Sequence, residues 1–126
     1  MTTRSEIVSV QPGALLGGTV QAGALTKAFT DCDADNGNKT TLTGTELFLV
    51  WNTDSGAQTI TFSSVADSMG RVGDIANYSV AANGHAIVGP FPTAGWQQVD
   101  GDIYYLASDA KVKVLPLKLS GSMIYR

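Results

Sequence analysis

The chain has 126 residues, of which 44% are hydrophobic and 15% are charged, so it can form one domain with one core. Ordinary globular chains are about 25% charged. The net charge is −3, and residues 28–110 hold ten acidic side chains against two basic ones. An acidic body of this kind repels phosphate backbones, which argues against nucleic acid as a partner.

Cysteine content and hydropathy constrain the class further. The single cysteine, Cys32, has no partner for an internal disulfide, so the chain is not a disulfide-rich secreted scaffold. No apolar run is long enough for a signal peptide or a membrane span. The sequence therefore predicts a soluble protein that is made in a cytoplasm and has no membrane partner.

Residues 1–23 differ in composition from the rest. They combine a short alternating piece at 7–10 with a Pro-Gly pair and three further glycines. We predict an extended N-terminal arm over 1–23, followed by one domain over 24–126. A poorly ordered tail is the alternative. Because disordered tails are poor in aliphatic side chains, we expect those of the arm to contact a neighbouring subunit or a capsid: Ile7, Val8, Val10, Leu15 and Leu16.

A loosely alternating segment, 24–30, predicts the first strand of the domain, and a polar loop follows it. The central stretch runs from Glu46 to Phe62. Its five consecutive apolar residues, 47–51, predict a strand covered on both faces, with Trp51 in the core. Residues 58–62 alternate, which predicts a half-buried strand with Ile60 and Phe62 inward. Because 52–56 has turn chemistry, we expect the two strands to form a β-hairpin.

The second half of the chain continues the pattern of short strands and turns. Asn83-Gly84 predicts a second hairpin, and Pro90 and Pro92 predict the end of its returning strand. Asp100-Gly101 predicts a turn before a strand at 103–106. The last strand begins at 111 with lysines outward, and its apolar parity shifts at Pro116, which predicts a bulge or a change of sheet. The fold class expected is all-β: a single antiparallel β-sandwich or jelly-roll-like domain.

Candidate chemistry is sparse. Acids at alternate positions from Asp31 to Asp35 resemble a calcium loop, but the EF-hand pattern requires Gly where Asn36 stands and Glu where Leu42 stands. We expect a solvated turn, with a calcium site of another kind as the alternative. His85 is the only histidine, so one chain has no zinc ligand set, and no serine lies in a nucleophile-elbow context. The sequence predicts no catalytic residue, metal or cofactor, and hence no enzyme.

One aromatic residue is a candidate for an exposed contact. Trp96 lies in a turn-rich segment and can form a stacking platform for sugar rings on one face of the sandwich, together with Trp51, Tyr78 and one of Tyr104 and Tyr105. The alternative, which we favour, is that Trp96 packs over the end of a sheet near Phe91.

The chain resembles the small β-sandwich head decoration, or capsid cement, proteins of tailed bacteriophages. The resemblance covers residues 37–119 and is carried by Thr-Gly-Thr-Glu-Leu-Phe-Leu-Val-Trp-Asn at 43–52, a Thr-rich second strand, Gly70-Arg71 with Gly73-Asp74, the turn at 80–84, Gly-Pro-Phe-Pro at 89–92, Asp100-Gly101 and the apolar strand at 114–119. It implies a structural protein on the outer surface of the virion capsid, bound to the major capsid protein where capsid subunits meet. It also implies a homo-oligomer, often a trimer. Another virion component of the tail or head–tail junction, or a glycan- or receptor-binding module, remains the alternative.

Overall fold

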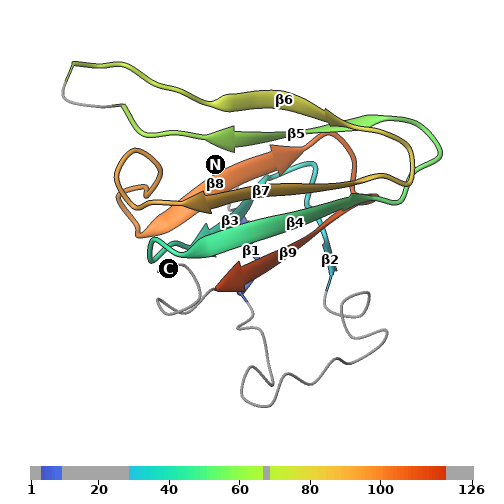
Figure 1. The fold of residues 1–126 in the computed structure, drawn as a ribbon, viewed down its shortest axis with the longest axis horizontal. Coiled ribbons are helices and arrows are strands. Elements are labelled where there is room, and N and C mark those ends of the chain that lie inside the picture. The colour runs from blue at the N-terminus through green and yellow to red at the C-terminus, as the bar shows by residue number, and fades with distance from the viewer. Residues whose placement is uncertain (1–3, 10–28, 67–68, 119–126) are drawn as a thin grey trace, which may run out of the picture.

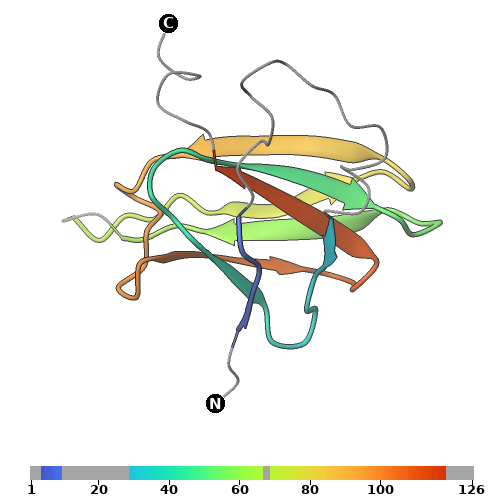
Figure 2. The same cartoon turned by 90° about the horizontal axis from the view of Figure 1, so that it is seen from below.

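The protein is a β-sandwich, seen in a computed structural model that describes residues 4–9, 29–66 and 69–118 (Figure 1). A five-stranded sheet has the order β1-β3-β8-β5-β6, and a four-stranded sheet has the order β2-β9-β4-β7. The predicted all-β sandwich is confirmed. Figure 2 shows the two layers from below. The strands are β1 (Ser5–Glu6), β2 (Thr30–Asp31), β3 (Asn38–Thr41), β4 (Glu46–Asn52), β5 (Gln58–Ser63), β6 (Ile75–Val80), β7 (His85–Phe91), β8 (Asp102–Ala107) and β9 (Val112–Lys118).

The core lies between the two sheets and is centred on a group of aromatic rings. The Phe48 ring lies 5.2 Å from those of Phe62 and Tyr105 and 5.7 Å from that of Phe91, in edge-to-face arrangements. Such pairs stabilise a core beyond the area that they bury. Ile60 and Phe62 are fully buried, which confirms their predicted inward direction.

The central stretch does not form the predicted hairpin. β4 belongs to the four-stranded sheet, where it pairs with β7 and β9, whereas β5 belongs to the five-stranded sheet. The polar segment between them crosses from one layer to the other. The buried Asn52 amide supports this crossing, because it donates to the carbonyl oxygens of Gly56, Val80 and Ala81. Turn chemistry reversed the chain as predicted, but the returning strand joined the other sheet.

The second predicted hairpin is wrong for the same reason. Asn83 has φ 58° and the Gly84 N–H donates to the Ala81 carbonyl at 2.8 Å, so a tight turn is present. It nevertheless connects β6 of one sheet to β7 of the other. From β2 to β9, each connection except β5–β6 passes between the sheets.

The bulge or change of sheet predicted at Pro116 in the last strand is also wrong. β9 pairs with β4 in one continuous register from Val112 to Lys118. Its interior face carries Val112 and Val114, and its other face carries Lys113, Leu115 and Leu117 in regular alternation. The apolar parity changes because both faces of the strand are apolar at this end, without a bulge. The register shifts lie elsewhere, in β4–β7 and in β5–β6.

β7 continues through Pro90 to Phe91, beyond the strand end predicted from the prolines. β7 is the last strand of its sheet, and proline is tolerated in an edge strand. Within the described residues, no helix is long and apolar enough to cross a membrane.

The beginning of the predicted arm lies on the sandwich. β1 pairs in parallel with β3, and the Ile7 N–H donates to the Lys39 carbonyl at 2.9 Å. The Ile7 side chain is buried in the core, and Arg4 Nη1 donates to the Tyr105 carbonyl. Residues 4–9 are therefore part of the domain that the sequence placed at 24–126. The parallel pair is the exception to the antiparallel pairing expected.

Candidate binding surface

The outer face of the four-stranded sheet, which is the face turned away from the core, carries several large side chains. Strand register places them in two rows across the sheet. One row runs through Leu115, Leu49 and Ile87. The other row runs through Asp31, Lys113, Trp51 and His85.

Trp51 lies in this outer face and not in the core, so the expectation that it is a core residue is wrong. Strand alternation directs Phe48 and Val50 inward, which places Trp51 on the opposite side. Its ring stacks on the His85 ring at 5.5 Å and meets the Phe29 ring edge-on at 5.5 Å.

A hollow of about 370 Å³ opens beside Trp51. Its walls come from β4, β7 and the residue before β2, and apart from one imidazole they are apolar: Phe29, Leu49, Val50, Trp51, His85, Ala86 and Ile87. Hollows of this composition suit an apolar group. No group of three metal-ligating side chains occurs in the described ranges.

β7 offers a free backbone edge beside this hollow. It is the last strand in its sheet, and among the described residues no strand pairs with the side that faces away from β4. The Asn52 N–H donates to the Gly84 carbonyl at 2.9 Å, so Gly84 faces β4. Because direction alternates along an antiparallel ladder, His85 and Ile87 point their N–H and C=O groups away from β4. The Ile87 side chain is 69% exposed.

The five-stranded sheet projects past this edge. In Figure 1, β5 and β6 lie beyond β7, away from β4. Tyr78 pairs with Ile60, whose side chain is fully buried, so both side chains lie on the interior face. Yet Tyr78 is 49% exposed. The interior face is therefore covered at β5 and only partly covered at β6.

This region is free of formal charge. All 8 basic and 11 acidic residues of the chain lie outside residues 75–99, which include β6 and β7. We call the combination of Tyr78, His85, Ile87 and the hollow beside Trp51 the β7 surface. From the sequence we named Trp51 and Tyr78 only as members of an aromatic stacking platform, and we did not predict this surface. The uncharged run is visible in the sequence and was the available signal.

The comparisons find no relative. No protein-family model, no curated protein and no solved structure matches the chain.

The residues predicted as arm contacts have different positions. Ile7 is buried inside its own domain, so it is not available to another subunit, whereas Val8 is 72% exposed. Val10, Leu15 and Leu16 lie outside the described residues.

Trp96, predicted as a candidate exposed aromatic residue, is half-buried. Its ring contacts the Phe91 ring edge-on at 4.8 Å and packs against the core. This is the alternative packing that the sequence favoured. The aromatic ring that lines an open hollow is that of Trp51.

The acidic loop at 31–35 is organised by protein donors. The Asp33 carboxylate accepts hydrogen bonds from the Ser5 hydroxyl at 2.6 Å, from the backbone N–H groups of Asp35 and Asn36, and from the Asn36 amide. These bonds, led by the one from Ser5, lower the pKa of Asp33 to about 2. Asp31 forms an ion pair with Lys113. The acids thus stabilise a turn and the adjacent strands.

Cys32 is a core thiol. It is 2% exposed, and burial, followed by the nearby charge of Asp31, raises its pKa to about 12. A thiol in this state is a poor nucleophile and a poor metal ligand.

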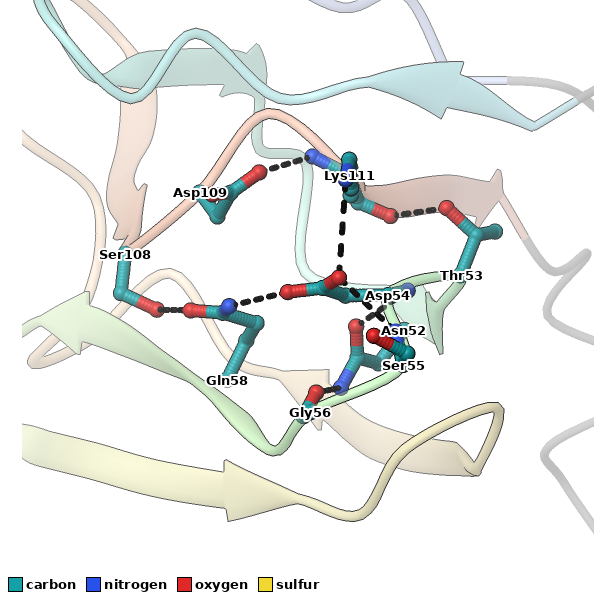
Figure 3. Close-up of polar contacts among 9 residues, drawn as sticks. All are labelled: Asn52, Thr53, Asp54, Ser55, Gly56, Gln58, Ser108, Asp109 and Lys111. Atoms are coloured by element: carbon teal, nitrogen blue, oxygen red, sulfur yellow. Dashed lines mark hydrogen bonds and ion pairs between the residues drawn. The ribbon is translucent and has the colours of Figure 1, made fainter.

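A polar network closes one end of the sandwich (Figure 3). Asp54 accepts from the Gln58 amide at 2.6 Å and lies 3.6 Å from the Lys111 ammonium group. The Gln58 bond is the main reason that the pKa of Asp54 is lowered. Gln58 in turn accepts from the Ser108 hydroxyl at 2.6 Å. This network joins the β4–β5 crossing to the β8–β9 crossing, so we interpret it as structural.

Proposed function

We propose that the protein is a structural virion protein that binds the outer surface of a phage capsid at junctions between major capsid subunits and stabilises the mature shell. The observation that carries the proposal is the β7 surface. It combines a free strand edge, the 69% exposed side chain of Ile87 and an apolar hollow in an uncharged region of an acidic chain. Such a surface fits contact with another protein. The resemblance to decoration proteins supplies the class of partner.

The charge distribution agrees with this role. An acidic body facing solvent keeps a particle that carries many copies from aggregating, while an uncharged patch permits close contact. Contacts repeated over a capsid are multiplied by avidity, so each copy needs only modest affinity. The resemblance also implies a homo-oligomer, with a trimer as the form expected; sedimentation equilibrium of the purified protein measures it.

The experiment is co-sedimentation of the purified protein with undecorated mature heads and, separately, with unexpanded precursor shells of the encoding phage. We expect saturable binding to mature heads at a fixed ratio to the major capsid protein, and little binding to precursor shells. Absence of binding to both would overturn the proposal.

Trp51 beside the hollow gives one specific reason to keep glycan binding as a second candidate, because sugar rings stack on tryptophan. The hollow has few polar groups to orient sugar hydroxyls, which favours a protein ligand. A glycan-dependent change in tryptophan fluorescence, together with no binding to heads, would support glycan binding as the function.

A further inference from the structure

We propose that an extended, uncharged segment of the partner protein adds as a strand to the free edge of β7 and inserts an apolar side chain into the hollow beside Trp51. This inference rests on the proposed function, under which the segment belongs to the major capsid protein. It assigns the contact to a particular edge of the sandwich and to a particular mode of recognition.

Within the described residues, the backbone of β7 has unpaired groups that an added strand can bind. His85 and Ile87 direct their N–H and C=O groups away from β4, and no described strand takes them. An added strand at the usual spacing of about 4.8 Å would satisfy these groups. In strand addition, main-chain hydrogen bonds supply affinity and pockets for alternate side chains supply specificity.

The hollow beside Trp51 can hold a side chain of the added strand. Alternate side chains of an added strand point to the outer face of the sheet, where Ile87 and His85 are their neighbours. The hollow of about 370 Å³ has room for a branched or aromatic side chain there. The remaining side chains of the added strand point to the interior, where Tyr78 is 49% exposed and gains a covering.

The ends of the site are defined by the register of β7. The pairing with β4 shifts between Glu46 and Phe48, which is the position of Gly89 and Pro90 on β7. A bulge of this kind interrupts a strand edge, so the regular part of β7 is the short run from His85 to Val88. The segment that binds is accordingly short.

The projecting sheet decides between a single strand and a second copy of this protein. A twofold pairing of β7 with its copy would place both five-stranded sheets on the same side. Since β5 and β6 project past β7 in each copy, the two sheets would overlap (Figure 1). A single extended segment has no such conflict. The lack of formal charge over residues 75–99 indicates that this segment is uncharged as well.

The test compares two exchanges of an exposed aliphatic side chain for lysine. Ile87→Lys adds a charge to the β7 surface, and Leu106→Lys adds one to the outer face of the five-stranded sheet, where Leu106 is 44% exposed. In the co-sedimentation assay with mature heads, we expect Ile87→Lys to weaken binding by about tenfold or more, because the added charge would be desolvated against an uncharged strand. Leu106→Lys should bind as the wild type does.

Hydrogen exchange of the wild-type protein supplies a measurement that needs no variant. On mature heads, the amides of His85 and Ile87 should exchange at least about tenfold more slowly than in the free protein. The amide of Ser79, an exposed residue of β6, should keep its rate. If the wild type binds heads but Ile87→Lys binds equally well and the β7 amides are unprotected, strand addition is overturned and the proposed function stands. If the wild type does not bind heads, both are overturned.

Discussion

The two edges of the sandwich are built in opposite ways. At one edge the terminal strands, β1 and β2, have 2 residues each. They are held by the Ser5–Asp33 hydrogen bond and by the ion pair of Asp31 with Lys113. At the other edge β6 and β7 have 6 and 7 residues, and neither contains a charged residue.

This difference indicates which edge is kept available. Exposed strand edges invite unwanted pairing, and proteins commonly protect them with short strands and charges. The β1–β2 edge has both protections. The β6–β7 edge has only bulges, and these leave His85–Val88 of β7 regular. We interpret the β1–β2 edge as stabilising the fold and the β6–β7 edge as a binding site for a partner.

The largest effect should come from removing the side chain that anchors the β1 edge. Ile7 is 5% exposed, and Ile7→Ala should lower the free energy of unfolding by about 2–4 kcal/mol, because it leaves a cavity under β1. The neighbouring Val8 is 72% exposed, so Val8→Ala serves as the matched control, with a cost within about 0.5 kcal/mol. Urea unfolding measures both. Equal effects of the two substitutions would show that β1 is not part of the folded unit.

A smaller effect should follow from removing the amide that joins β1 to the acidic loop. Asn38 is buried, accepts from the Asp33 N–H at 2.8 Å and donates to the Ser5 carbonyl at 3.2 Å. Asn38→Ala leaves these two backbone groups without their partner, at a cost of about 1–3 kcal/mol. Ser79→Ala, on the exposed face of β6, should be nearly neutral in the same unfolding experiment. A neutral Asn38→Ala would mean that water replaces the amide freely.

Sequence patterns predicted the fold class, the approximate strand positions and the inward direction of Ile60 and Phe62. They did not predict which strands pair. Turn residues such as Asn83-Gly84 reverse the chain locally, but whether the returning strand pairs with the previous one or crosses to the other layer depends on contacts far away in sequence. For this reason both predicted hairpins are crossings between sheets.

The same limit explains the errors at the candidate site. An apolar run at 47–51 reads as buried on both faces, yet Trp51 lies on the outer face because only one face of β4 meets the other sheet. The edge position of β7 is a property of strand order, and its one local sign, Pro90 within the strand, was interpreted as a strand end. The uncharged run at 75–99 was visible in the sequence, but segments without charge are also common in cores. A core segment and an uncharged binding surface can be told apart only by their burial, which requires the fold.

Acid should destabilise the β1–β2 edge, because its acidic loop is held by the charged carboxylate of Asp33. The pKa of Asp33 falls from an ordinary value of 3.8 to about 2 because hydrogen bonds from Ser5 and Asn36 favour the charged carboxylate. Its folded-state pKa is below its unfolded-state value, so its contribution to stability is present above about pH 4 and is lost as the pH falls toward about 2. Thermal unfolding of Asp33→Asn between pH 2 and pH 6 should show a shallower pH dependence than the wild type. Identical slopes would contradict this account of the loop.

The smallest effect on stability is expected at the edge proposed for binding. Ile87 is 69% exposed and its strand edge faces away from β4, so Ile87→Lys should change the free energy of unfolding by no more than about 0.5 kcal/mol, as should Leu106→Lys. Urea unfolding of both variants beside the wild type tests this. A cost well above 1 kcal/mol for Ile87→Lys alone would mean that this side chain is already covered in the free protein. The β7 edge would then belong to the fold, as the β1 edge does, and would not be open to a partner.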